Sequence, residues 1–237
     1  MSDPSNIQAL IFDVFGTVVD WRRSIAREAT EFAAKHGLSL DGEHFADDWR
    51  ALYQPAMARV REGQMDFVKL DVLHRMNLDE LLARHDITGL PEAEVDYLNR
   101  AWHRLDPWPD TVAGLTRLHR KFILGTMSNG NVALMVNMAR RAGLPWDVIL
   151  GGDVVRHYKP EPESYLKSVA LLSLQPAEVM LVAAHASDLE AAAACGLRAA
   201  YVRRPEEHGP NTYKEPDTSA FDYVADDFLD LADQLGS

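Results

Sequence analysis

Residues 7–17 read IQALIFDVFGT, a short apolar run that ends at Asp13 and is followed by the turn-like pair Gly16-Thr17. The run from Ile7 to Phe12 has the length and near-continuous hydrophobicity of a strand buried on both faces. It therefore predicts an interior strand that delivers a carboxylate at its carboxyl end. In open α/β sheets this is the edge at which ligands bind.

Apolar strands and helices of about ten residues alternate in the second half of the chain. Strands are expected at 122–127, 148–151, 179–184, 199–202 and 223–224, and helices at 111–120, 132–142, 161–172, 189–195 and 227–235. This alternation is typical of a parallel sheet covered on both faces, and right-handed crossovers make it doubly wound. The fold class predicted is α/β, with a Rossmann-like core. Residues 203–220 are interpreted as a polar loop.

Between the first strand and this alternation lies a stretch with helical periodicity and no strand-like run. It extends over residues 21–104, and Gly37, Gly63 and Gly89 stand where its helices should end. We expect an all-helical cap at 21–104, inserted after the first strand of a core formed by 1–20 and 105–237. Such a cap would cover the carboxyl edge of the sheet.

Composition excludes several classes of protein. The 237 residues carry 24 Lys+Arg and 36 Asp+Glu, and the net charge of −12 opposes general binding to a phosphate backbone. The hydrophobic fraction of 47% and charged fraction of 25% fit a folded globular chain. A single cysteine, Cys195, allows no internal disulfide, and the start MSDPSN lacks the features of a signal peptide. No apolar run approaches the ~18 residues of a membrane span, so neither a nucleic acid nor a membrane is an expected partner. A cytoplasmic protein is expected.

Polar residues gather in four segments that follow strands or sit in loops at the sheet edge. They are Asp13-Val14-Phe15-Gly16-Thr17, Ser128-Asn129-Gly130, Tyr158-Lys159-Pro160 and His185-Ala186-Ser187-Asp188. Because strands of a parallel sheet end at one edge, two carboxylates, a hydroxyl, an amide and an ammonium could converge there. Each segment alone has a plainer interpretation, such as a turn or a helix N-cap.

Taken together and in this order, the four segments resemble the haloacid dehalogenase superfamily, and within it the L-2-haloacid dehalogenase (type II) branch. The resemblance covers the chain from Ile7 to Leu235. Phosphatases of the superfamily carry a second Asp two residues after the first, as general acid and as part of the Mg²⁺ site. This chain has Phe15 at that position, and the dehalogenase branch likewise carries an aromatic residue there. The resemblance therefore implies neither a metal nor another cofactor.

The resemblance also implies the roles of the central residues. Asp13 would attack C2 of a haloacid and expel halide with inversion, which leaves an aspartyl ester that water then hydrolyses. Lys159 would keep Asp13 ionised, Thr17 would fix its rotamer, and Asp188 would orient Lys159 and the water. Thr17 could equally well serve only to stabilise the turn.

One segment departs from the best-known family members. They carry Ser-Ser-Asn-Ala-Trp-Asp where this chain has Ala183-Ala184-His185-Ala186-Ser187-Asp188. The departure affects the step in which water is activated. His185, with an unperturbed pKa of about 6.5, could hydrogen-bond the water or Asp188 directly. The alternative is a structural histidine.

The remaining candidates are substrate-binding residues that the resemblance implies. Ser128 and Asn129 match contacts to the substrate carboxylate and halide, and Arg50 matches an arginine that receives the halide; the plainer interpretations are a turn and a surface arginine. Aromatic walls are expected from Phe15, Phe67, Trp108 and Tyr165, with core packing as the alternative.

The function expected is hydrolysis of a short (S)-2-haloacid, a chloro- or fluoro-substituted acetate or propionate, to the 2-hydroxy acid and halide. Two alternatives stay open: a phosphatase or phosphonatase of the same fold, and a non-catalytic binder of small carboxylates. By analogy with the family, a homodimer is expected.

Overall fold

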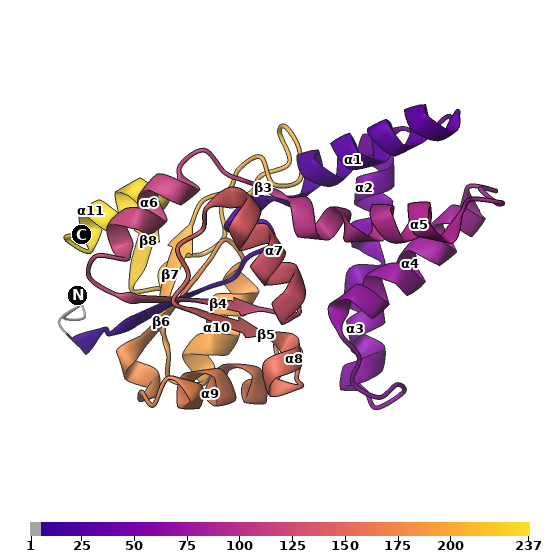
Figure 1. Cartoon of the computed structure of the whole chain (residues 1–237). Helices are drawn as coiled ribbons and strands as arrows, with labels where there is room; N and C mark the ends of the chain where they lie inside the picture. Colours follow the sequence, from indigo (N-terminus) through magenta and orange to yellow (C-terminus); the bar gives the residue numbers. More distant parts are fainter. Residues whose placement is uncertain (1–5) are drawn as a thin grey trace.

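A single sheet of six parallel strands lies at the centre of the molecule (Figure 1). The computed structural model describes residues 6–237. The strand order is β5-β4-β1-β6-β7-β8, with β1 Ala9–Phe12, β4 Ile123–Ser128, β5 Val148–Gly151, β6 Val179–Ala183, β7 Arg198–Val202 and β8 Tyr223–Ala225. β1 pairs with β4 on one side and β6 on the other. The residue that follows β1 therefore stands at the middle of the sheet edge.

Alternate residues of β1 enter two separate hydrophobic cores. Leu10 and Phe12 belong to the core on one face, and Ala9 and Ile11 to the core on the other. The helices of the first face are α6 Thr111–Leu118, α7 Val132–Ala142 and α11 Phe228–Gln234; those of the second are α9 Pro162–Leu171 and α10 Ala186–Ala194. This layering confirms the predicted doubly wound α/β fold. A short helix α8 (Gly152–Val155) and the 3₁₀ helix η3 (Pro176–Glu178) complete the core.

Residues 21–104 are helical and stand together to one side of the sheet (Figure 1). The helices are α1 Trp21–His36, α2 Gly42–Ala51, α3 Tyr53–Arg61, α4 Leu70–Arg84, α5 Glu92–Asn99 and the 3₁₀ helix η2 Arg100–Arg104. The Asp20 side chain accepts a hydrogen bond at the start of α1, and Gly37 ends it with a left-handed conformation at φ +65°.

The two crossings between this helical insert and the core form an unexpected two-stranded sheet. β2 (Val19–Asp20) pairs antiparallel with β3 (Asp106–Pro107). A strand of two residues is too short to show a periodic pattern of hydrophobic residues in the sequence.

Residues 203–220 form the expected loop, and part of it is buried. Arg204 donates two hydrogen bonds to Asp110, at 2.8 and 2.9 Å, and a third to the carbonyl of Thr17. Glu207 is also buried, with 5% of its surface exposed. The loop is thus fastened to the sheet edge beside Asp13.

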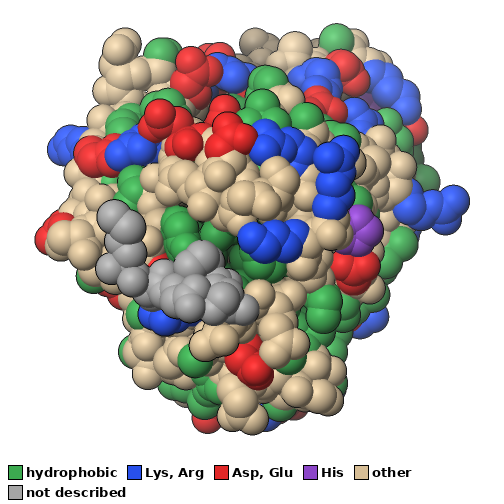
Figure 2. Space-filling model, turned by 90° about the vertical axis from the view of Figure 1, so that its left-hand side faces the viewer, with side chains coloured by type: hydrophobic (Ala, Val, Ile, Leu, Met, Phe, Trp, Pro, Cys, Tyr) green, Lys and Arg blue, Asp and Glu red, His purple; other side chains and the backbone are tan. Residues whose placement is uncertain are grey.

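The surface shows no single sign of charge on the face drawn in Figure 2, where Lys and Arg alternate with Asp and Glu. None of the helices in residues 6–237 combines the length and the apolar character needed to cross a membrane. Residues 1–5, which make up most of the start MSDPSN where no signal peptide is expected, lie outside the described range.

Candidate active site

Asp13 is the centre of a buried cluster of polar groups. Its backbone N–H continues the sheet by donating to Val182 O at 3.0 Å. Thr17 Oγ1 donates to Oδ2 at 2.8 Å and Lys159 Nζ to Oδ1 at 2.8 Å. Burial by itself would raise the pKa of Asp13, but the ammonium of Lys159 and the ring of His185 hold that pKa far below its ordinary value. Asp13 is therefore a carboxylate throughout the neutral range.

Lys159 bridges the two acidic residues of the cluster. Its ammonium lies 2.8 Å from Asp13 Oδ1 and 2.5 Å from Asp188 Oδ2. Burial opposes the charge, but the two carboxylates outweigh it and raise the pKa of Lys159. Asn129 Oδ1 accepts a hydrogen bond from the Lys159 backbone at 2.7 Å, which fixes the segment that carries the amine. Tyr165 donates to the other oxygen of Asp188 at 2.6 Å.

His185 faces Asp13 and the loop residue Glu207 rather than Asp188, which corrects one of its two expected contacts; the contact with the hydrolytic water stays a prediction. The ring Nδ1 lies 3.0 Å from Asp13 Oδ2, and Nε2 lies 3.0 Å from both oxygens of Glu207. Burial lowers the pKa of His185, but the two carboxylates outweigh burial and raise it to about 10. The helix α10 begins at Ala186, earlier than expected, and His185 is its N-cap residue with an extended backbone.

Arg50 brings a positive charge from the helical insert. Its guanidinium carbon lies 4.2 Å from the ring centre of Tyr53 and 5.2 Å from that of Trp21. A cation over aromatic faces is stabilised by the ring quadrupoles. The atom Nη1 is buried and has no hydrogen-bond partner among the residues described. A buried donor of this kind is suited to an anion.

A cavity of about 450 Å³ joins these groups. Its walls come from both the sheet edge and the helical insert, and they consist of Asp13, Phe15, Arg50, Tyr53, Gln54, Arg61, Asn129, Lys159, Pro160, Tyr165, His185, Ser187 and Asp188. The cavity therefore combines the buried carboxylate of Asp13 with the cationic donor of Arg50 and an aromatic wall. A small anion would fit this combination. In residues 6–237, no group of three or more His, Cys, Asp or Glu side chains is arranged to hold a metal ion.

Comparison with known proteins gives a consistent result. Residues 7–196 match the model of the haloacid dehalogenase-like hydrolases. The chain belongs to this family. A solved defluorinating L-2-haloacid dehalogenase is 50% identical to this hydrolase, with a TM-score of 0.95 over 98% of this chain and 96% of the other. A second L-2-haloacid dehalogenase structure is 46% identical, with a TM-score of 0.92 over 97% and 99%. The (S)-2-haloacid dehalogenase 1 of Pseudomonas sp. (strain CBS-3) is 29% identical over 213 residues, which are 85% of this chain and 88% of that protein.

Most of the site residues expected in this dehalogenase-like hydrolase lie together. Those that line the cavity are Asp13, Phe15, Arg50, Asn129, Lys159, Tyr165, His185 and Asp188. Thr17 does not line it but donates a hydrogen bond to Asp13. Ser128 does not line it, and its Oγ accepts a hydrogen bond from the Gly130 backbone at 3.1 Å.

The expected positions of two aromatic residues are corrected. Phe67 packs against Tyr158 with ring centres 5.2 Å apart, and Trp108 donates its indole N–H to Gly16 O at 2.9 Å. Neither lines the cavity. Tyr53 provides an aromatic wall in their place, and its ring lies against the guanidinium of Arg50 inside the same cavity.

Sequence reasoning missed Tyr53, Gln54 and Arg61 in the insert, and Glu207 in the core. The insert residues belong to helices whose relative placement has no sequence signature. Glu207 is one acid in a polar stretch, and its approach to Gly16 is visible only in the structure. A Cβ on Gly16 would lie 2.0 Å from Glu207 Oε1, and the φ of Gly16 is +89°. The glycine is therefore required both for the turn and for the approach of the acid.

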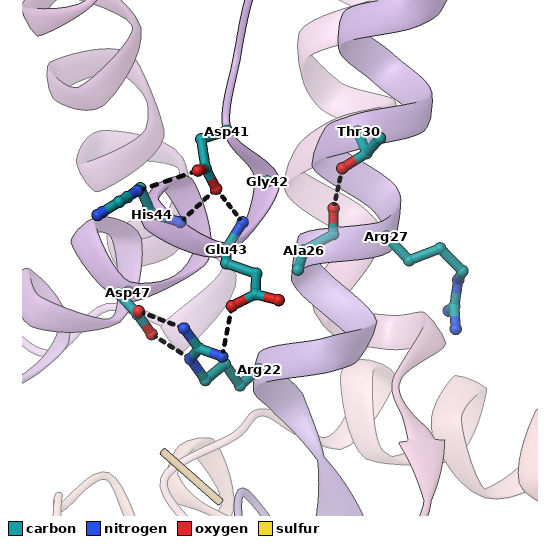
Figure 3. A pocket seen from close by; sticks show the side chains of 9 residues that line it. All are labelled: Arg22, Ala26, Arg27, Thr30, Asp41, Gly42, Glu43, His44 and Asp47. Atoms are coloured by element: carbon teal, nitrogen blue, oxygen red, sulfur yellow. Dashed lines mark hydrogen bonds and ion pairs between the residues drawn. The ribbon is translucent and has the colours of Figure 1, made fainter. Parts of the chain in front are cut away.

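A second cavity, of about 480 Å³, lies between α1 and α2 (Figure 3). Its central cation, Arg22, is already paired with Asp47 at 2.7 Å and with Glu43 at 3.1 Å. Asp41 caps α2 through the backbone of Glu43 and His44. These charges are satisfied within the protein, and we assign no ligand to this cavity.

Proposed function

We propose that this hydrolase removes halide from short (S)-2-haloacids, such as chloro- or fluoro-substituted acetate or propionate, and yields the 2-hydroxy acid of inverted configuration. The observation that carries the proposal is the buried carboxylate of Asp13, which faces a cavity where the Arg50 guanidinium offers a donor that has no partner among residues 6–237. The dehalogenases to which the chain is similar support the same reaction class.

In the first step, an oxygen of Asp13 attacks C2 of the substrate and the carbon–halogen bond breaks. Arg50 and the Asn129 amide bind the anionic groups of the substrate and the departing halide, while Phe15 and Tyr53 exclude water around the carbon centre. The Lys159 ammonium keeps the nucleophile ionised. The products of this step are halide and an ester between Asp13 and the substrate.

In the second step, water attacks the carbonyl carbon of the Asp13 ester. Asp188, held by Lys159 and Tyr165, accepts a proton from this water. The alcohol oxygen of the product then comes from Asp13, and a water oxygen takes its place in the carboxylate. Overall, haloacid and water give hydroxy acid, halide and one proton.

We also propose that residues 21–104 act as a cap domain on a core of 1–20 and 105–237. Arg50, Tyr53 and Arg61 all come from the helical insert, so the cavity is complete only when the insert covers the sheet edge. Arg61 also donates a hydrogen bond to the carbonyl of Lys159 at 3.2 Å, which links the two parts beside the reaction centre. The homodimer and the cytoplasmic location stay predictions.

The substitution Asp13→Asn tests the proposal, because an amide cannot form the ester. Halide release, measured with an ion-selective electrode on chloroacetate, fluoroacetate and both enantiomers of 2-chloropropionate, should fall to background. Asp48→Asn, which changes an exposed acid on α2, should keep wild-type turnover. Near wild-type halide release by the Asp13 variant would refute the assignment.

A single turnover in ¹⁸O water with excess enzyme gives an independent check. The ester route places unlabelled aspartate oxygen in the product, whereas direct attack by water labels it at once. Release of p-nitrophenol from its phosphate, or tight binding of haloacid without turnover, would instead favour one of the two alternatives.

A further inference from the structure

The two oxygens of Asp13 have different surroundings. Oδ2 receives the hydroxyl of Thr17 at 2.8 Å and the ring of His185 at 3.0 Å, whereas Oδ1 has one donor among residues 6–237, the ammonium of Lys159. The Thr17 hydroxyl is directed at Oδ2 because its own oxygen accepts the N–H of Ala184 at 2.9 Å. An oxygen with two donors is the weaker nucleophile, so Oδ1 is the atom that attacks carbon.

This assignment, which rests on the proposed function, makes Oδ2 the carbonyl oxygen of the ester. When water attacks Cγ, the electron pair of the C=O bond moves to Oδ2. Thr17 and His185 are then already placed to donate to the oxyanion, at the distances that such stabilisation requires. A charged imidazolium stabilises that oxyanion more strongly than a neutral ring.

His185 contacts two carboxylates, and one of them loses its negative charge during the reaction. Once Asp13 is alkylated it is neutral, and Glu207 is the anion still in contact with the ring. Glu207 is itself buried and oriented by the indole N–H of Trp21, which donates to Oε1 at 3.0 Å. If His185 turned away, Glu207 would keep the indole N–H of Trp21 and the His208 ring at 3.8 Å but would lose its close contact with a ring nitrogen at 3.0 Å.

We propose that Glu207 is a positioning residue for ester hydrolysis: it holds His185 protonated and aimed at Oδ2, so that the ring donates to the oxyanion formed in the second step. Water bonds to Cγ and gives one proton to Asp188. The tetrahedral carbon then reforms its C=O bond and breaks the Cγ–Oδ1 bond, and the departing alkoxide takes the proton from Asp188. The second water proton leaves to solvent as Asp13 returns to its carboxylate.

Glu207→Gln tests this assignment, because glutamine has the same shape without the charge. In a rapid-quench experiment with excess chloroacetate, the variant should release one equivalent of halide at the wild-type rate or faster and then slow down. We expect the rate constant for ester hydrolysis to fall by about 100-fold, the order of effect for losing one oxyanion donor. Intact-protein mass spectrometry should show the ester accumulating on Asp13.

The pH profile separates this role from a merely structural one. In the wild type, carboxylates raise the pKa of His185 to about 10. In the alkylated Glu207→Gln enzyme neither carboxylate is charged, so burial takes the pKa of His185 below its ordinary 6.5. Ester hydrolysis by the variant should therefore be rescued as the pH falls toward 6. The other ionisable groups nearby are Lys159 and Asp188 beyond Asp13, and His208, 3.8 Å from Glu207.

Glu206→Gln is the matched control, since it removes the same charge from the neighbouring residue, which pairs with Arg23 at the surface. It should show wild-type kinetics. If Glu207→Gln does not fold, His185→Ala takes its place and should accumulate ester without rescue at low pH.

Turnover by Glu207→Gln without ester accumulation would overturn the proposal, as would ester hydrolysis that accelerates with rising pH, which would make His185 a base. Absence of halide release by the wild type would instead refute the function itself.

Discussion

Replacing Lys159 by methionine removes the one ammonium that joins Asp13 and Asp188. The Lys159 side chain lies 2.8 Å from one carboxylate and 2.5 Å from the other, and about a tenth of each of the three side chains is exposed. Two unit charges 3 Å apart attract each other by about 5–6 kcal/mol at an effective dielectric constant of about 20. Part of this attraction is offset by desolvation, and breaking a buried pair destabilises a protein by about 3–5 kcal/mol.

For a chain of this size, that loss corresponds to a midpoint of thermal unfolding lower by about 6–20 °C near pH 8. The difference should shrink in acid. A carboxyl group whose pKa is lowered by folding adds stability above its unfolded value of 3.8 and loses that stability as the pH falls through the folded pKa. Without the ammonium, only His185 still opposes the effect of burial, so the pKa of Asp13 lies higher in the variant than in the wild type and the variant takes up a proton at a higher pH.

Thermal unfolding at pH 8 and at a pH below 3.8, together with halide release, measures both effects. We expect turnover to fall by about 10²–10³-fold, because a preorganised charge at the reaction centre is lost. Lys167→Met is the matched control, since this lysine is exposed on α9 and its ammonium hydrogen-bonds the His157 ring at 2.7 Å, away from the site. A Lys159→Met protein with an unchanged midpoint and wild-type turnover would show that the bridge has neither role.

Two further substitutions test the cavity from opposite sides. Arg50→Lys should raise KM for the haloacid by about 10–100-fold with a smaller change in kcat, because lysine lacks the planar fork that pairs with a carboxylate; an unchanged KM would place substrate elsewhere. Gly16→Ala should destabilise the protein by about 1–3 kcal/mol in urea unfolding, since the residue has φ +89° and its Cβ would lie 2.0 Å from Glu207 Oε1. Wild-type stability of that variant would contradict the close approach.

The regular elements could be predicted because their causes are local. The helix at 132–142 and the strand at 148–151 have the expected bounds, and Asp13 follows an apolar run of strand length. Polar groups placed just after several such strands meet at one edge of a parallel sheet, so the convergence of Asp13, Lys159 and Asp188 could also be expected. The elements that were missed, β2, β3, α8 and η3, are too short to show a periodic hydrophobic pattern.

The side chains that were misplaced belong to contacts between distant segments. Phe67 and Trp108 are aromatic residues of the kind that lines cavities. In the structure, however, Phe67 packs against Tyr158 and Trp108 hydrogen-bonds the carbonyl of Gly16. Glu207 had no signal of its own, although it is more deeply buried than most acids. A lone acid in a polar loop is normally solvated, and only the folded chain brings it to His185.

The order of residues alone determined that this chain forms a doubly wound sheet, that a helical segment interrupts it, and that a carboxylate, an amine and a second carboxylate share one edge. Only the tertiary structure decided which atoms meet there: that His185 spans Asp13 and Glu207, and that Arg50 is enclosed by aromatic rings with one donor unpaired. Periodicity and strand ends are set by neighbours along the chain, whereas these contacts join residues as many as 172 positions apart and depend on how whole helices pack.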